Sequence, residues 1–178
     1  MRQSFQYGFT LIEVVLGGLT LAIAIAAIMG AYVGQVALSE HARNLSLAIQ
    51  DANRIIEQIR QSGASCGTNP QIATTWPSGT DWDNWLTVAG GGKSIQPDPL
   101  NNERVNVTCQ NNQSSAVVSC NSTGGIDPIR VTVATCWRHR GRTIGECTPT
   151  GVLAASDNNS NGIIESPAML TTLVTCRG

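Results

Sequence analysis

The chain has little charge and few of the side chains on which hydrolytic and metal enzymes depend. Only 13% of its 178 residues are charged, about half the share in an average globular protein. The two histidines, His41 and His139, stand apart from any serine or cysteine nucleophile pattern, so the sequence does not support acyl-transfer chemistry. No cysteine pair has the C-x-x-C spacing of zinc and thioredoxin-like sites. We therefore expect a protein that is not an enzyme and requires no cofactor.

A strong charge of either sign is also missing. The formal net charge of −1 gives no general attraction to nucleic acid or acidic lipid. The one dense basic run, residues 137–142 (Trp-Arg-His-Arg-Gly-Arg), could hold phosphates or bases, but it is short, and a solvated turn is favoured. Residues 90–94 (Gly-Gly-Gly-Lys-Ser) lack the first glycine of a phosphate-binding loop, because Thr87 stands there. We expect a flexible loop at 90–94 and no nucleic-acid partner.

What the chain does have is an uncharged run of 25 residues, from Val14 to Leu38. As a helix, at about 1.5 Å per residue, such a run is long enough to cross the ~30 Å hydrocarbon core of a bilayer. Glu13 stands at its start. A carboxylate in lipid is costly unless a cation pairs with it, so an acid at this position indicates a function.

Beyond the uncharged run, apolar residues recur in steps of four and three, which is typical of one face of a continuing helix. They are Leu38, Ala42, Leu45, Ile49, Ala52, Ile56 and Ile59. We expect the helix to end at about Gln61. The repeat is short for a coiled coil, and packing on a sheet of the same chain is favoured.

The remainder predicts a head built around a sheet. Residues 62–103 are rich in Gly, Pro and Trp and predict a long irregular link. Trp76, Trp82 and Trp85 in this link either stack on sugars or partners or cover a small core, and the core is favoured. Strand patterns follow at 104–110, 115–121, 128–137 and 169–176, with a hairpin turn at 111–114 between the first two. The predicted fold class is α+β, with one long N-terminal helix on an antiparallel sheet of about four strands.

Six cysteines lie in the head, and none lies in the helix. In an oxidising compartment they can form up to three disulfides, with fifteen connectivities left open. They are Cys66, Cys109, Cys120, Cys136, Cys147 and Cys176.

A short segment near the C-terminus resembles the first part of a calcium-binding loop. Its candidate ligands are Asp157, Asn159, Asn161, the carbonyl of Ile163, and Glu165. Ala168 stands where such loops carry their bidentate acid, so any site for Ca²⁺ is a weak one. An Asn-Gly turn that needs no metal is the favoured interpretation.

The N-terminus carries the most specific motif. Residues 8–14 read Gly-Phe-Thr-Leu-Ile-Glu-Val after a short polar leader, and this motif resembles the type IV prepilin signal shared by pilins, minor pilins and secretion pseudopilins. The resemblance covers residues 1 to about 61. It implies cleavage after Gly8 by the prepilin peptidase, N-methylation of Phe9, and a role for Glu13 in neutralising the terminal amine of a neighbouring subunit. It also implies the pilin fold.

These expectations divide the chain into a leader (1–8), a transmembrane and fibre-core helix (9–38), an amphipathic helix half (39–61) and a head (62–178). The implied function is a structural subunit of a type IV pilus or a type II secretion-like pseudopilus, with a minor pilin favoured. Its partners would be other pilin subunits, through the N-terminal helix, and the assembly machinery. It would reside in the bacterial inner membrane with its head outside the cytoplasm, and then in a pilus or periplasmic pseudopilus.

Two alternatives stand beside this interpretation. On the same scaffold, the protein could be a tip or surface-exposed binding module, such as an adhesin or a DNA-uptake pilin. Alternatively, the N-terminus could be an ordinary secretory signal with Ala24-Ile25-Ala26 as its cleavage site, or a plain membrane anchor. The carboxylate of Glu13 and the apolar residues beyond Ala26 argue against an ordinary signal.

Overall fold

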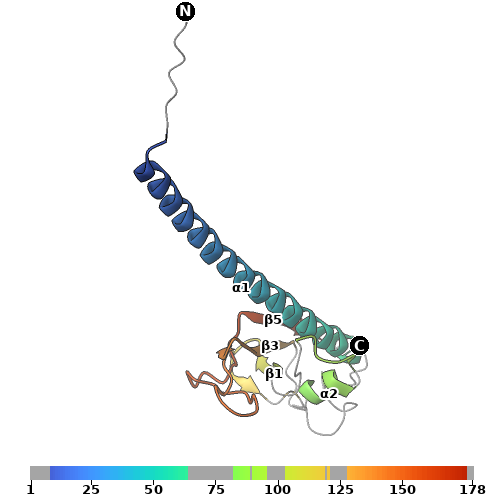
Figure 1. Cartoon of the computed structure of the whole chain (residues 1–178). Coiled ribbons are helices and arrows are strands. Elements are labelled where there is room, and N and C mark those ends of the chain that lie inside the picture. The colour runs from blue at the N-terminus through green and yellow to red at the C-terminus, as the bar shows by residue number, and fades with distance from the viewer. Residues whose placement is uncertain are drawn as a thin grey trace, which may run out of the picture. The chain divides into compact units, whose positions relative to one another are not determined.

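A computed structural model describes residues 9–63, 82–88, 90–95, 103–118, 120 and 128–175 (Figure 1). Its helices are α1 (Leu11–Gly63) and α2 (Trp82–Val88). Its strands are β1 (Glu103–Asn111), β2 (Val117–Val118), β3 (Ile129–His139), β4 (Arg142–Ile144) and β5 (Ala168–Val174). The chain divides into two compact units, Met1–Ala42 and Arg43–Gly178. The helix predicted from Phe9 to Gln61 is confirmed as one element that begins and ends within two residues of those positions.

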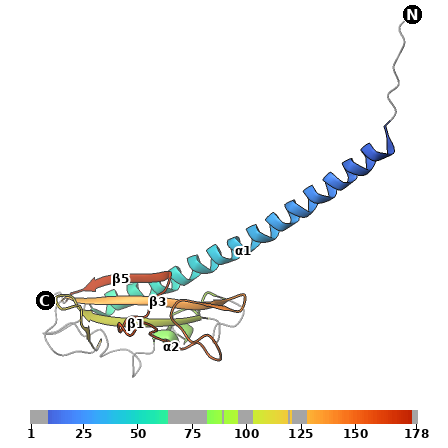
Figure 2. The ribbon, with the colours of Figure 1, turned by 90° about the vertical axis from the view of Figure 1, so that its left-hand side faces the viewer.

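The second unit is organised around β3, the longest strand of an antiparallel sheet (Figure 2). One edge of β3 pairs with β1, from Glu103 opposite Trp137 to Asn111 opposite Ile129. The other edge pairs with β5 along residues 129–135 and with β4 along 137–139. The short β2 pairs with the outer edge of β1. The predicted α+β class and antiparallel sheet are therefore confirmed.

The main core lies between the C-terminal part of α1 and the sheet. Apolar side chains of α1 pack there against alternate residues of the strands, because the period of a helix and the period of a strand each place their apolar residues on one face. The buried members of this core are Ala52, Ile55, Ile56, Ile59, Trp82, Trp85, Leu86, Val105, Cys109, Ile129, Val131, Val133 and Val174. The predicted packing of this helix on a sheet of the same chain is thus confirmed for the part of α1 in the second unit.

The set of apolar residues predicted for the packed face of α1 is wrong in two details. The buried face also takes in Ala48 and Ile55, which the pattern of four-and-three steps left out, because a helix on a sheet buries a face wider than one line of residues. At the other end, Leu38 and Ala42 belong to the first unit, where their side chains are exposed.

The predicted irregular link at 62–103 contains a helix. In α2, Trp82, Trp85 and Leu86 are buried and spaced to lie on one helical face, and the two indole rings meet edge-on with centroids 5.8 Å apart. The core role predicted for these two tryptophans is confirmed, whereas Trp76 lies outside the described residues. Gly90 follows α2 closely: a Cβ there would come within 2.8 Å of the Leu86 Cα, and the Gly90 N–H donates to the Trp85 carbonyl at 2.9 Å.

The strand predictions need two corrections. The second strand is shorter than the predicted 115–121 and spans only Val117–Val118 in the described residues. In addition, β4 follows β3 directly through a tight turn at Arg140 and Gly141, whose φ angles are 49° and 76°. Two successive positive φ angles are the geometry that joins antiparallel strands with a two-residue loop, so part of the basic run at 137–142 is strand.

Candidate functional site

The N-terminal candidate residues lie at the start of α1. Gly8 lies outside the described residues, and Phe9 is 85% exposed. The Thr10 carbonyl accepts hydrogen bonds from the Glu13 and Val14 N–H groups at 3.0 and 3.3 Å, and the Thr10 hydroxyl donates to the Glu13 carboxylate at 3.4 Å. A threonine followed three residues later by a glutamate is the sequence of a capping box. In the structure the two side chains contact each other rather than the backbone N–H groups that a capping box satisfies, so Glu13 has a local contact at the helix start that is separate from any role in assembly.

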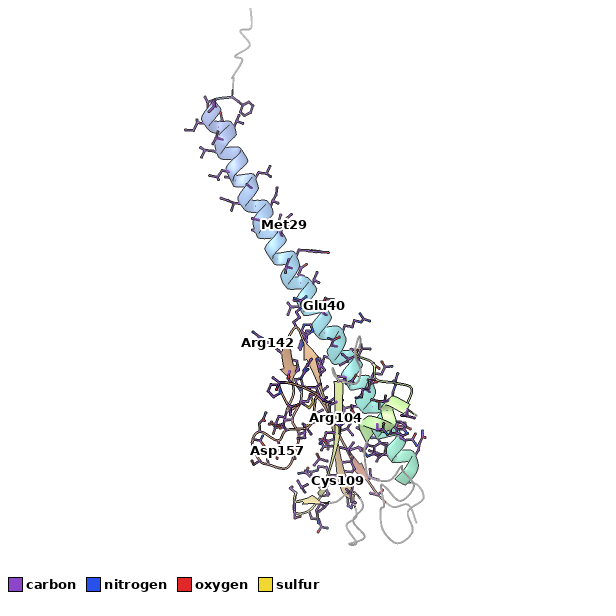
Figure 3. The ribbon with its side chains drawn as sticks, turned by 60° about the horizontal axis from the view of Figure 1, so that its bottom comes forward. Met29, Glu40, Arg104, Cys109, Arg142 and Asp157 are labelled. Atoms are coloured by element: carbon purple, nitrogen blue, oxygen red, sulfur yellow. A yellow bond between two sulfur atoms is a disulfide. The ribbon has the colours of Figure 1, made fainter. Side chains whose placement is uncertain are left out.

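The first half of α1 exposes apolar side chains on all sides, as the sticks around Met29 illustrate (Figure 3). This helix is long and apolar enough to cross a membrane, and its most apolar stretch is not buried within the protein. An apolar surface of this extent is typical of a membrane or protein interface. The exposed large side chains are Phe9, Leu11, Ile12, Val14, Val15, Leu16, Leu19, Leu21, Ile23, Ile25, Ile28, Met29, Tyr32, Val33, Val36 and Leu38.

Glycines interrupt this apolar surface at Gly17, Gly18, Gly30 and Gly34. A Cβ at any of the four would meet no atom within 4 Å, so these positions do not serve packing within the described protein. Small residues on an apolar helix allow a second helix to approach closely. The surface is therefore suited to contacts between helices.

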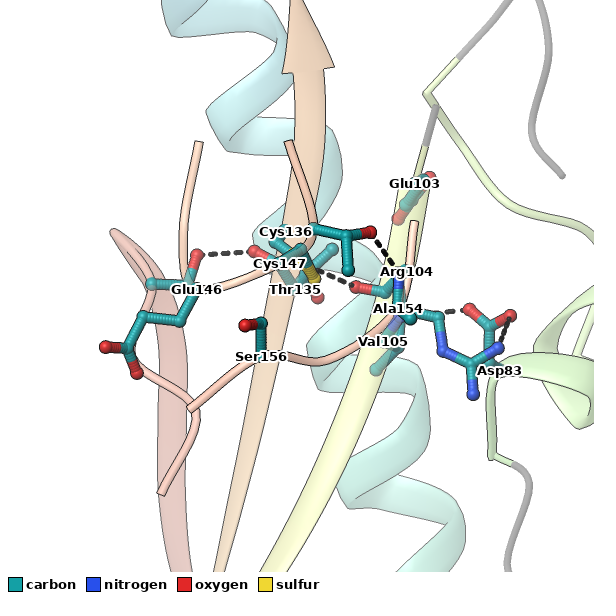
Figure 4. The surroundings of a disulfide bond; sticks show 12 residues. Asp83, Glu103, Arg104, Val105, Thr135, Cys136, Glu146, Cys147, Ala154 and Ser156 are labelled. Carbon is teal, nitrogen blue, oxygen red and sulfur yellow. Dashed lines mark hydrogen bonds and ion pairs between the residues drawn. A yellow bond between two sulfur atoms is a disulfide. The ribbon is translucent and has the colours of Figure 1, made fainter. Parts of the chain in front are cut away.

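Two disulfides are present in the head. Cys109 pairs with Cys120, joining β1 to the segment after β2, with the Cα atoms 5.2 Å apart. Cys136 pairs with Cys147, joining β3 to the segment after β4, with the Cα atoms 6.3 Å apart (Figure 4). Cys66 and Cys176 lie outside the described residues. Each bond closes a short loop, and loops of this length are stabilised by about 3 kcal/mol, as expected in an oxidising compartment.

The predicted calcium loop brings its candidate residues together, but their oxygen atoms bond to the loop itself. The two oxygens of Asp157 accept from the N–H groups of Asn161 and Gly162 at 3.2 and 2.6 Å. Asn159 Oδ1 accepts from the Asn161 N–H at 3.0 Å, and Asn161 Oδ1 accepts from the Ile163 N–H at 2.7 Å. The Asn161 amide donates to the Glu165 carboxylate at 3.0 Å.

This turn is closed by hydrogen bonds to its own amides. Gly162 has a φ of 80°, which favours glycine, and the Glu165 carboxylate is turned towards an amide donor rather than towards the other oxygens. In the part of the chain that the structure describes, no three acids, histidines or cysteines form a group that could hold a metal ion. Calcium binding stays a prediction.

Replacing Asp157 by alanine should lower the free energy of unfolding by about 1–2 kcal/mol, because the turn loses two hydrogen bonds to a charged acceptor. Asp157→Asn, which keeps one acceptor oxygen, should cost less. Thermal unfolding in chelator measures both effects. We expect the unfolding temperature of the unmodified protein to be the same in excess calcium. A rise in calcium that Asp157→Ala abolishes would contradict the metal-free turn.

Sequence patterns missed a cluster of buried charged side chains around Asp83. The Lys93 ammonium donates to Asp83 Oδ2 at 2.9 Å and to the Glu103 carbonyl at 2.8 Å. Arg104 also donates to Asp83 Oδ2, at 3.0 Å, and the Val105 N–H donates to Asp83 Oδ1 at 2.9 Å (Figure 4). Lys93 is only 5% exposed and Asp83 7%. The flexible loop predicted at 90–94 is therefore wrong: these contacts hold it to α2 and β1.

A second group of contacts joins the same segment to α1. Asp51 is fully buried, and its two oxygens accept from the Ser94 N–H and hydroxyl at 2.7 and 2.6 Å. Arg54 pairs with Asp51 at 3.2 Å and donates to the Gly92 carbonyl at 3.1 Å. The Ile95 N–H donates to Glu103 Oε2 at 3.0 Å. No sequence pattern predicted this group, because residues 90–94 are glycine-rich and were interpreted as a flexible loop.

Burial raises the pKa of Glu103 from 4.5 to about 8, and the negative charge of Asp51 and a side-chain hydrogen bond with Asp51 add to the shift. The Ile95 N–H and the Lys93 ammonium act in the opposite direction. At neutral pH this carboxyl therefore keeps its proton, and it can donate a hydrogen bond.

The basic run at 137–142 is used largely within the head. Arg138 donates to the Gly151 carbonyl at 2.6 Å, and His139 Nδ1 lies 3.3 Å from the Asn44 amide nitrogen. Gly141 and Arg142 are exposed at the turn. The first unit thus carries an apolar helix with an acid at its start, and the second carries two local disulfides and a buried charged cluster. Comparison of the chain with protein-family models, curated proteins and solved structures gives no match.

Proposed function

We propose that the protein is a structural subunit of a type IV pilus or a related secretion pseudopilus, held in the bacterial inner membrane before assembly. The observation that carries the proposal is α1 itself. Its first half exposes apolar side chains on every face, and its second half packs on a disulfide-bonded α+β head. A helix of this kind can reside in a bilayer as a monomer and bury the same surface against other helices in a fibre.

A membrane anchor alone does not require two features of this helix. An anchor needs no carboxylate at the start of its apolar run, and Glu13 is costly in lipid unless a cation pairs with it. Nor does it need glycines with open space around them, whereas close contacts between helices do. Cleavage before Phe9 would create the missing cation, a terminal amine, which a neighbouring subunit could place beside Glu13.

The head favours a minor, specialised subunit over the bulk subunit of a fibre. It carries two disulfides and long connections between strands, including the loop from β4 to β5. We expect the protein in trace amounts relative to the main subunit when purified fibres are quantified by mass spectrometry.

Replacing Glu13 by glutamine separates the two roles of this residue. Glutamine keeps the size of glutamate and an oxygen that can accept from the Thr10 hydroxyl, so the helix and its membrane insertion should be retained. The positive terminal amine would then be buried without its partner, and breaking a buried charge pair costs about 3–5 kcal/mol. We expect incorporation into sheared fibres or secretion complexes to fall by at least about tenfold, measured by immunoblotting.

Glu13→Asp, which keeps the negative charge, is the matched control and should retain more incorporation than Glu13→Gln. Resistance to carbonate extraction should be equal in all three proteins. Normal assembly of Glu13→Gln would contradict the charge pairing. A loss of membrane insertion would show instead that Glu13 acts through the helix alone.

A further inference from the structure

We propose that Asp51 and Glu103 share one proton beneath residues 90–95, and that this proton latches the 90–95 segment onto α1 and β1. The inference concerns the head alone and does not depend on the proposed function. It makes the 90–95 segment a pH-sensitive element of the fold.

The geometry of the two acids supports the latch. Both residues are fully buried, one on α1 and the other at the start of β1. Adjacent residues of the segment bond to different acids, Ser94 to Asp51 and Ile95 to Glu103 Oε2. Glu103 Oε1 is buried and has no hydrogen-bond donor among the described residues. This oxygen is the place for a proton, which it can donate to Asp51.

Among the described contacts no cation pairs directly with the Glu103 carboxyl, although the Lys93 ammonium, which donates to the Glu103 carbonyl at 2.8 Å, acts to lower its pKa. On α1, Arg54 pairs with Asp51. The Lys93 ammonium of the segment and the Arg104 guanidinium of β1 both bind Asp83 of α2. Opposite Glu103 on β3 lies Trp137, which carries no charge. Two negative charges cannot both be buried here without a large cost, and one proton removes it.

The direction of the pH effect follows from where the proton binds more tightly. In the closed latch Glu103 has a pKa of about 8, and in an open, hydrated state we expect its ordinary 4.5. Between these two pH values the open state loses a proton that the closed state keeps. The equilibrium constant for opening should therefore rise tenfold for each pH unit. The latch is firmest at acidic pH, and its free energy of closing stops changing above about pH 8.

Hydrogen exchange of the Ser94 and Ile95 amides, measured by NMR on the full chain in detergent micelles, tests the latch. Base catalysis alone raises an exchange rate about tenfold per pH unit. In the latch, opening adds a further tenfold, so the logarithm of the rate should rise with a slope of about two between about pH 5 and 8, and about one above it. The Gly162 amide, in the separate turn at Asp157, should show a slope of one throughout.

Glu103→Gln is the decisive variant, because glutamine has the same shape, can donate to Asp51 and does not titrate. Its Ser94 and Ile95 amides should exchange with a slope of one at every pH. Asp51→Asn removes the neighbouring negative charge, so the slope should fall from two to one at a lower pH than in the unmodified protein. A slope of one in the unmodified protein would overturn the proposal, whether or not the variants fold. A slope of two retained in Glu103→Gln would also overturn it.

Discussion

Replacing Gly8 by a bulky residue should trap the uncut precursor in the membrane and leave no free amine at Phe9. The expected effect is close to all-or-none, because the proposed peptidase acts on one peptide bond and a side chain at Gly8 would occupy space beside it. The structure places Phe9 and Thr10 ahead of α1, which begins at Leu11. The bond therefore precedes the helix in the sequence, and its cleavage leaves the whole of α1 in the mature protein.

N-terminal mass spectrometry of the exported protein measures this effect. The unmodified protein should yield a peptide that begins at methylated Phe9, and Gly8→Ala is the control with the smallest added side chain. A mature protein that begins near Ala27 would overturn the pilus proposal, because an ordinary signal peptidase would then have removed most of the apolar helix. The same experiment thus separates the two interpretations of the N-terminus.

Asp83→Ala should lower the free energy of unfolding of the head by about 3–5 kcal/mol. The substitution leaves the Lys93 ammonium buried without its counter-ion and the Val105 N–H without its acceptor, and a broken buried ion pair has a cost of this size. For a domain of this length, the unfolding temperature should fall by about 10 °C or more. Thermal or urea unfolding monitored by circular dichroism measures the change.

The double variant Asp83→Ala/Lys93→Met is the matched test of the cause. Because it removes both buried charges, it should be more stable than Asp83→Ala alone. Glu57→Ala, at an exposed position of α1, should change the free energy of unfolding by less than about 0.5 kcal/mol. If the double variant is no more stable than the single one, the loss at Asp83 does not come from the uncompensated charge.

Local sequence patterns were sufficient to predict the longest helix and the longest strands. Hydropathy and the apolar steps predicted α1 to within two residues at each end, because a long helix repeats its signal many times. Alternation predicted most of β1, β3 and β5. The elements that pattern missed are the seven residues of α2 and the three of β4, which are too short to show a period.

The charged cluster was missed for a different reason. Asp51 is not among the apolar residues that predicted the packed face of α1, yet its carboxylate is buried and accepts hydrogen bonds from Ser94, which lies 43 residues later. Lys93 stands in a glycine-rich segment that resembles a flexible loop. Neither residue has a sequence neighbour that indicates burial, because the neighbours that bury it come from other elements.

The sequence by itself determined the long N-terminal helix, its apolar first half, the acid at its start and the strands on which its second half packs. These features depend on the hydropathy and spacing of residues within a few helical turns or one strand, so they can be predicted without knowing which distant residues they contact. Only the tertiary structure decided which cysteines pair, that the turn at Asp157 closes on its own amides, and that the buried Glu103 carboxyl lies beside Asp51. The pKa of a carboxyl depends on its hydration and on the charges within a few ångströms, and for Glu103 those charges come from Asp51 of α1 and Lys93 of the 90–95 segment.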